Sequence, residues 1–148
     1  MIQIRVLSAN VPVFRKFVTM RALLMHPFVL VFFGGGLGSV LRYALGRLIP
    51  ATLTGSPFPT AILFVNAVAS FVLGVIVSWV VGRSAGEEAR LLIGVGFCGG
   101  LSTFSSFSND TIILAQNGRF GAALLNIGIN VLLCLVASAG GLWFGQKL

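Results

Sequence analysis

The chain is poor in charged residues. Only 9% of its 148 residues are Asp, Glu, Lys or Arg, whereas 57% are hydrophobic. A soluble domain carries about a quarter charged residues. The composition therefore excludes an ordinary soluble fold and indicates a membrane protein, with the lipid bilayer as its surroundings.

Acids, histidine and cysteine are scarce as well. The three acids and the one histidine are Glu87, Glu88, Asp110 and His26. Most catalytic sites need a base with an orienting partner, and because the sequence shows no such constellation, we expect no enzyme. Cys98 and Cys134 both lie in apolar segments, and two cysteines are too few for a disulfide framework or a thiolate metal site.

The formal charge of +7 raises the question of nucleic acid, since a basic surface is the usual mark of nucleic-acid binding. Here the Lys and Arg residues are scattered at the ends of apolar segments, which is where positive residues flank membrane spans. We therefore expect no nucleic-acid partner.

Four apolar stretches are long enough to cross ~30 Å of hydrocarbon as helices. They cover residues 28–48, 60–81, 91–116 and 122–144, with loops at 49–59 and 82–90. The predicted fold class is an all-α membrane protein with four transmembrane helices, which form one domain over residues 28–145.

The first 27 residues stand apart from this domain because they carry four basic residues and no acid. The segment could be an interfacial amphipathic helix or a targeting presequence. It could also lie upstream of the real start, at Met20 or Met25. We favour a dispensable tail or a wrongly assigned start. The basic residues are Arg5, Arg15, Lys16 and Arg21.

The third apolar stretch contains Gly96–Asp110, with the sequence GFCGGLSTFSSFSND. Three glycines followed by Ser and Thr disfavour a continuous helix, since each Gly costs about 1 kcal/mol against Ala. We expect the helix to break here, in mid-membrane. Broken backbone persists in a bilayer only when it is buried in protein or lines a wet cavity. A kink made by packing and an ion site are the two interpretations left open.

Aromatic and polar side chains follow the glycines. Phe104 and Phe107 share one face if this segment is helical, with Ser105 and Ser106 between them. Asp110 falls three residues past Phe107, on the same face. The simpler interpretation is a lipid-facing or packed Phe pair beside a paired or water-facing carboxylate.

Other polar residues lie inside the remaining spans. Asn66 in the second span fits an interhelical hydrogen bond. Arg42, near the end of the first, is either functional or snorkels to the headgroups. Asn126, Asn130 and Cys134 recur every fourth residue on the last span, and this stripe serves either packing or a ligand.

Three ordered motifs carry a resemblance to a known family. Gly96–Asp110, GGGLGSVLRY at Gly34–Tyr43 and VNAVASFVLG at Val65–Gly74 together resemble the CrcB/Fluc family of fluoride channels, and the resemblance covers residues 28–145. It implies a fluoride-selective channel that passively exports F⁻ and so lowers cytoplasmic fluoride. It also implies an antiparallel, dual-topology homodimer.

The resemblance further implies roles for individual residues. The two Phe rings would offer their positive edges to the anion, and amide and hydroxyl groups would supply hydrogen bonds. Asn66 matches the family's VN motif, and the stripe on the last span matches a polar track that is usually hydroxyl-bearing. The implied fluoride pathway comprises Asn66, Thr103, Phe104, Ser105, Ser106, Phe107, Asn126 and Asn130.

A structural, untransported Na⁺ is implied as a cofactor at the centre of the dimer, bound by backbone carbonyls of Gly99 and Ser102. Ser102 stands where the family usually has Thr, but a carbonyl ligand does not depend on that side chain. Arg42 matches an Arg of a GxxxR-like motif, and Asp110 stands where the family often has Glu. No role follows for these two residues from the motif alone.

Two other functions remain as alternatives. A small proton-coupled multidrug transporter would need a membrane-embedded acid, yet the first two spans have none and Asp110 lies near the end of the third. A structural membrane subunit would use its Gly-xxx-Gly pairs, at Gly34/Gly38 and Gly141/Gly145, only for assembly.

Overall fold

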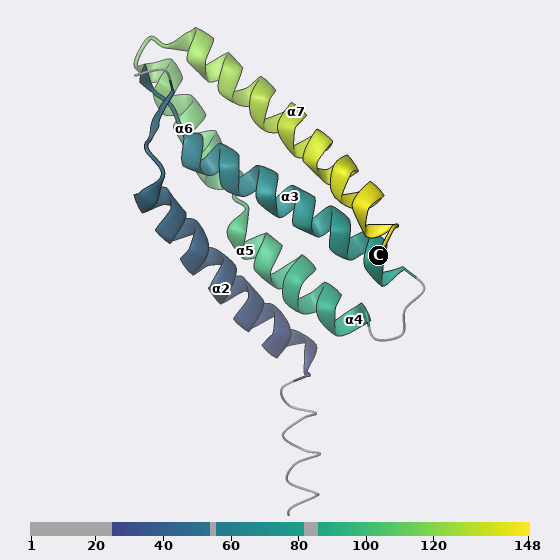
Figure 1. Ribbon diagram of the computed structural model, residues 1–148. Coiled ribbons are helices and arrows are strands. Elements are labelled where there is room, and N and C mark those ends of the chain that lie inside the picture. Colours follow the sequence, from purple (N-terminus) through teal and green to yellow (C-terminus); the bar gives the residue numbers. More distant parts are fainter. Residues whose placement is uncertain (1–24, 54–55, 82–85) are drawn as a thin grey trace, which may run out of the picture.

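The computed structural model describes residues 25–53, 56–81 and 86–148 (Figure 1). Residues 1–24 of the predicted basic tail lie outside these ranges. Within the described ranges, four helical segments are long and apolar enough to cross a membrane. They confirm the predicted all-helical membrane fold with four spans.

The four spans begin and end close to the predicted positions. The first is α2 (Pro27–Leu48), the second is α3 (Thr60–Val80) and the fourth is α7 (Phe120–Gly145). The third covers Gly86–Gln116, five residues more than predicted at its start. Residues 86–90, assigned to a loop from their charge, are helical, and an ion pair of 2.7 Å between Arg90 and Glu87 stabilises the added turn.

The third span consists of four pieces. These are α4 (Gly86–Ala89), the π-helix η1 (Arg90–Cys98), the short α5 (Gly99–Leu101) and α6 (Phe104–Gln116). Between α5 and α6, Ser102 and Thr103 take extended backbone angles. The predicted break is present, but it falls just after the glycines rather than at them.

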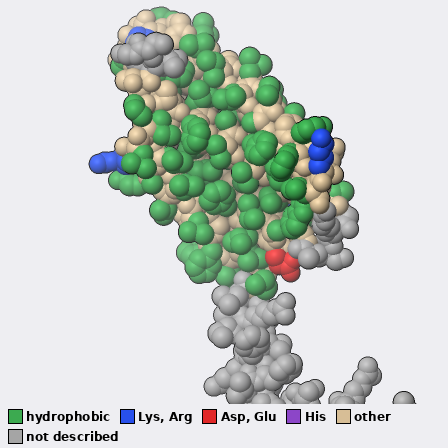
Figure 2. Space-filling view, in the orientation of Figure 1, with side chains coloured by type: hydrophobic (Ala, Val, Ile, Leu, Met, Phe, Trp, Pro, Cys, Tyr) green, Lys and Arg blue, Asp and Glu red, His purple; other side chains and the backbone are tan. Residues whose placement is uncertain are grey.

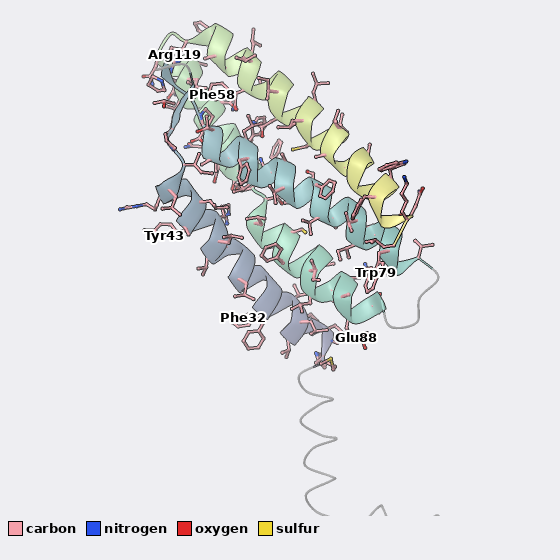
Figure 3. All side chains as sticks on the ribbon, viewed as in Figure 1. Phe32, Tyr43, Phe58, Trp79, Glu88 and Arg119 are labelled. Atoms are coloured by element: carbon pink, nitrogen blue, oxygen red, sulfur yellow. The ribbon has the colours of Figure 1, made fainter. Side chains whose placement is uncertain are left out.

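A two-stranded hairpin connects α2 to α3. Strands β1 (Thr52–Leu53) and β2 (Ser56–Pro57) pair antiparallel in a segment predicted as a plain loop. The hairpin lies at the same end of the molecule as the α6–α7 turn (Figure 1). There Arg119 donates a hydrogen bond to the Pro57 carbonyl, and Figure 3 shows Arg119 beside the buried Phe58.

Glycines bring α2 directly against the first half of the third span. A Cβ atom at Gly34 would overlap the Leu92 carbonyl oxygen, and one at Gly38 would lie 2.7 Å from the Leu101 nitrogen. A Cβ at Gly100 would in turn overlap the backbone of Gly35. The glycines near the break therefore serve close packing, which explains why the helix continues through them.

Glycines also allow close packing between α3 and α7. Gly74 of α3 faces the backbone of Leu142, 2.9 Å from an added Cβ, and Gly145 of α7 faces the backbone of Val75. A Cβ atom added at Gly141 would overlap backbone atoms of Phe71. The Gly141/Gly145 pair thus packs helices within one chain.

The interior is small and the outer surface is apolar. The central cluster of buried hydrophobic residues contains Val65, Ala69, Cys98 and Leu101. Figure 2 shows hydrophobic side chains over most of the visible face, with basic and acidic groups near its edges. Phe32 and Tyr43 project outward from α2 (Figure 3), at 75% and 70% exposure. Such a surface fits lipid rather than water.

Candidate ion pathway at the helix break

Polar groups at the break replace the missing helical bonds. Thr103 is the N-cap of α6, and its Oγ1 accepts the Ser106 N–H at 3.2 Å. On the other side, the Cys98 carbonyl accepts both the N–H and the hydroxyl of Ser102 at 2.9 Å. The sequence places hydroxyls on both sides of the break, so each half-helix has its own cap.

Asn66 of α3 bridges the break. Its Oδ1 accepts the Thr103 N–H at 2.8 Å, and its Nδ2 lies 3.4 Å from the Thr103 carbonyl oxygen. In a continuing helix the Thr103 N–H would donate to the carbonyl of Gly99, and the Ser106 N–H to that of Ser102. Both donors go to side chains instead, which releases these two carbonyls.

Arg42 also binds at the break. Its Nε donates to the Gly100 carbonyl oxygen at 3.1 Å, while Ser39 Oγ lies 3.5 Å from the same oxygen. A cation at the C-terminal end of a half-helix is favoured by the helix dipole. The structure thus directs this guanidinium group to the third span instead of to the headgroups.

Buried amides continue the polar contacts from Asn66 into α7. Asn66 Nδ2 donates to Asn130 Oδ1 at 3.3 Å, and Asn130 Nδ2 donates to Asn126 Oδ1 at 2.9 Å. Asn126 Nδ2 donates to Thr111 Oγ1 at 2.8 Å, and that hydroxyl donates to the Phe107 carbonyl at 2.7 Å. We call the side chains of Asn66, Asn130, Asn126 and Thr111 the amide chain.

A cavity of about 260 Å³ lies beside the break between α3, α6 and α7. It brings together four of the predicted pathway residues with Asn66, and none of the described acidic or basic residues lines it. The Phe104 and Phe107 ring centroids are 5.5 Å apart, and Phe104 is 80% exposed. The lining consists of Asn66, Ser70, Ser102, Thr103, Phe104, Phe107, Asn130, Val131 and Cys134.

The other three predicted pathway residues are not among the residues that line this cavity. The hydroxyls of Ser105 and Ser106 are 3.1 and 3.2 Å from Thr103 Oγ1. Asn126 is fully buried, and its side chain forms hydrogen bonds with Thr111 and Asn130. These three residues touch groups that line the cavity without lining it themselves.

Asp110 lies apart from the break. It lines a second cavity beneath the β1–β2 hairpin, together with Phe58 and Pro59. Within the described parts of the chain, no residue forms a hydrogen bond or ion pair with its carboxylate. Because Asp110 follows Phe107 by three residues, the sequence predicted that it shares the face of Phe104 and Phe107. The hairpin that covers Asp110 could not be predicted from this spacing.

Two residues of the site were not singled out from the sequence. Ser70 lines the cavity and donates to the Asn66 carbonyl at 2.8 Å. Thr111 ends the amide chain and is 9% exposed. In the sequence, only their spacing points to them. Ser70 follows Asn66 by four residues and Thr111 follows Phe107 by four, which places each pair on one helix face.

At the helix break, backbone carbonyl oxygens are the groups that could bind a hard monovalent cation such as Na⁺. The described residues contain no cluster of His, Cys, Asp or Glu able to hold a metal. The released carbonyls of Gly99 and Ser102 are oxygen ligands of the kind that hard cations prefer. Gly99 is exposed, and an added Cβ would meet no atom within 4 Å, so one chain offers few ligands and leaves room for a second copy.

Comparisons with known proteins show the family of the chain. The family model described as CrcB-like protein, Camphor Resistance (CrcB), matches residues 29–142. A protein of Pyrococcus furiosus named fluoride-specific ion channel FluC is 47% identical over 106 residues, 70% of this chain and 82% of its own. Proteins of the same name from Shewanella woodyi and Thermus thermophilus are 39% and 46% identical, over 84% and 68% of this chain and 96% and 80% of their own. The chain is therefore a multi-pass membrane protein that belongs to the CrcB family.

Proposed function

We propose that this protein is a fluoride-selective channel that passively exports F⁻ across the cell membrane. The observation that carries the proposal is the cavity at the helix break, which is lined by amide, hydroxyl and aromatic groups and by no charged side chain of the described residues. The names of the relatives support it. Because conduction is passive, the fluoride gradient sets the direction of flow.

Neutral donors suit the physical problem of moving fluoride. The ion is small and strongly hydrated, so a pore must replace its water with hydrogen-bond donors and still release it. The Asn66 amide and the Thr103 hydroxyl can supply such donors, and the edges of Phe104 and Phe107 add a weaker attraction. A fixed Lys or Arg in the cavity would hold the anion more tightly and slow its exit.

The proposal extends to a dimer with a structural sodium ion. Two released carbonyls are fewer ligands than a hard cation takes, which for Ca²⁺ is about six to eight oxygens. A second, antiparallel copy would double the number, with Gly99 and Ser102 contributed by each chain. The ion would link the two copies, while fluoride passes elsewhere.

The two alternatives fit the structure less well. A proton-coupled drug transporter needs an acid within the substrate site, yet Asp110 lies in a separate cavity from Asn66 and Phe107. A structural subunit would use glycines for assembly, but Gly34, Gly38, Gly141 and Gly145 all pack helices of the same chain.

Flux from liposomes tests the function. Purified protein is reconstituted into vesicles loaded with potassium fluoride, valinomycin is added, and efflux is followed with a fluoride electrode beside a chloride control. Fast fluoride efflux without chloride efflux is the expected result. Silence from folded, dimeric protein with sodium present would overturn the proposal and favour the structural subunit.

A further inference from the structure

We propose that Thr111 and Asn126 are positioning residues, which together with the Thr103 N–H hold the Asn66 amide so that its N–H groups, rather than its carbonyl oxygen, are offered to the cavity at the helix break. They act through the amide chain and do not themselves touch the ion. This inference rests on the proposed function. It names the hydrogen bonds by which the cavity presents N–H donors to an anion.

Both ends of the amide chain are backbone groups with fixed roles. The Thr103 N–H can only donate, so it requires the oxygen of Asn66, which lies 2.8 Å away. At the other end, the Phe107 carbonyl can only accept. The single hydrogen of the Thr111 hydroxyl is given to that carbonyl at 2.7 Å, and Thr111 must therefore accept from Asn126.

The amides between these ends must donate in the same direction along the chain. Side-chain oxygen and nitrogen of Asn are similar in size, so an amide's orientation is set by its partners. If either Asn126 or Asn130 were reversed, oxygen would face oxygen and NH₂ would face NH₂. Asn126 is 0% exposed, so water cannot repair a mismatch at its side chain, and a buried unpaired polar group is costly.

The orientation leaves Asn66 Nδ2 as the least committed donor. Its bonds to Asn130 Oδ1 and to the Thr103 carbonyl are 3.3 and 3.4 Å long, beyond the usual range for N–H···O. Asn130 Nδ2, by contrast, is held by Asn126 Oδ1 at 2.9 Å. Since Asn66 lines the cavity, an anion there can recruit its N–H groups at little cost.

Thr111 is a suitable place to test the chain because it lies outside the cavity. Thr111→Val keeps the side-chain shape but removes the hydroxyl, which leaves Asn126 Nδ2 without its acceptor. Asn66 and Asn130 are then held only by the Thr103 N–H and by the Asn126 backbone carbonyl, which accepts from Asn130 Nδ2 at 3.2 Å. Thr111→Ser keeps the hydroxyl. Ser108→Ala is the matched control, a hydroxyl removed from the same helix at a residue with no side-chain hydrogen bond among the described residues.

In the vesicle assay, we expect Thr111→Val to lower fluoride efflux at least about tenfold, while Thr111→Ser and Ser108→Ala stay within about twofold of wild type. Asn126→Leu is a second variant in case Thr111→Val does not fold. Its side chain is of similar size but neither donates to Thr111 nor accepts from Asn130, so we expect a similar loss. Wild-type efflux from folded Thr111→Val or Asn126→Leu would overturn the proposal.

A second measurement does not depend on flux. In protein labelled with ¹⁵N-asparagine, the Asn66 side-chain amide resonances are assigned by their loss in Asn66→Ser. We expect them to shift in Thr111→Val and to stay in place in Ser108→Ala, although Thr111 and Asn66 lie on different helices. Unshifted resonances would refute the positioning role, whereas a silent wild-type channel with shifted resonances would refute only the fluoride function.

Discussion

At the scale of single residues, the site depends on where each hydrogen bond is directed. The sequence was enough to single out Asn66, Arg42 and the two Phe residues, because polar and aromatic groups inside membrane spans are conspicuous. It could not tell that Asn66 accepts from the Thr103 backbone or that Arg42 donates to Gly100. Those partners lie 37 and 58 residues away in the chain, and no local pattern encodes such contacts.

The aromatic pair gives the first prediction. Phe104→Ile or Phe107→Ile should abolish fluoride efflux while the dimer still assembles, because side-chain volume is roughly kept and the positive ring edge is lost. Phe120→Ile, which changes a ring that is 67% exposed on α7, should conduct normally. Efflux and size-exclusion chromatography measure both properties. Wild-type flux from an assembled double variant would contradict the proposal that the ring edges attract fluoride.

Arg42 gives the second prediction. Arg42→Gln should lower the free energy of unfolding by about 1–3 kcal/mol, since the Gly100 carbonyl loses its charged donor. Arg47→Gln removes an exposed charge from the last turn of the same helix and should change stability by less than about 0.5 kcal/mol. Thermal unfolding in detergent compares the two, and equal stability would mean that the Arg42 contact contributes nothing.

At the scale of the helices, the spans could be predicted but the cause of the break could not. Length and hydropathy located all four spans within a few residues at most ends. The glycines Gly96 and Gly100 were taken as helix breakers, yet α2 packs so closely against them that a continuous helix is stabilised there. The break occurs at Thr103 instead, where Asn66 competes successfully for the backbone N–H.

Close helix packing gives the third prediction. Gly38→Ala should destabilise the protein by about 1–3 kcal/mol or more, because the added Cβ would lie 2.7 Å from the Leu101 nitrogen and backbone cannot easily move aside. Gly36→Ala on the same helix meets nothing within 4 Å and should be neutral or stabilising by up to about 1 kcal/mol. Melting curves decide the matter, and a Gly38 variant as stable as the Gly36 variant would show that α2 is more loosely packed.

At the scale of the whole molecule, one chain leaves its site incomplete. Phe104 is 80% exposed beside the cavity, and the Gly99 region is open, so a second copy is expected to provide the missing wall. We predict that replacing sodium by a large organic cation dissociates the dimer and lowers flux. Ser102→Ala should keep the wild-type sodium dependence, because only its carbonyl is proposed as a ligand. A dimer that is indifferent to sodium in analytical ultracentrifugation would contradict this proposal.

An antiparallel dimer also requires both orientations in the membrane, which depends on Lys and Arg in the connecting segments. With four spans, both ends of the chain lie on one side. Without the N-terminal segment that side carries three basic residues against two opposite, which is nearly balanced, whereas residues 1–24 add four and favour termini in the cytoplasm. The three are Arg83, Arg90 and Lys147, and the two are Arg47 and Arg119.

We therefore predict that removing residues 1–24 shifts the chain from mostly cytoplasmic termini to a mixture of both orientations. C-terminal fusions to two reporters, each active on only one side of the membrane, measure the ratio. Arg47→Gln in the shortened chain is the control, since removing one of the two opposing charges should restore cytoplasmic termini. If the shortened chain inserts in a single orientation, antiparallel pairing cannot form within one population, and the proposed dimer would have to be parallel.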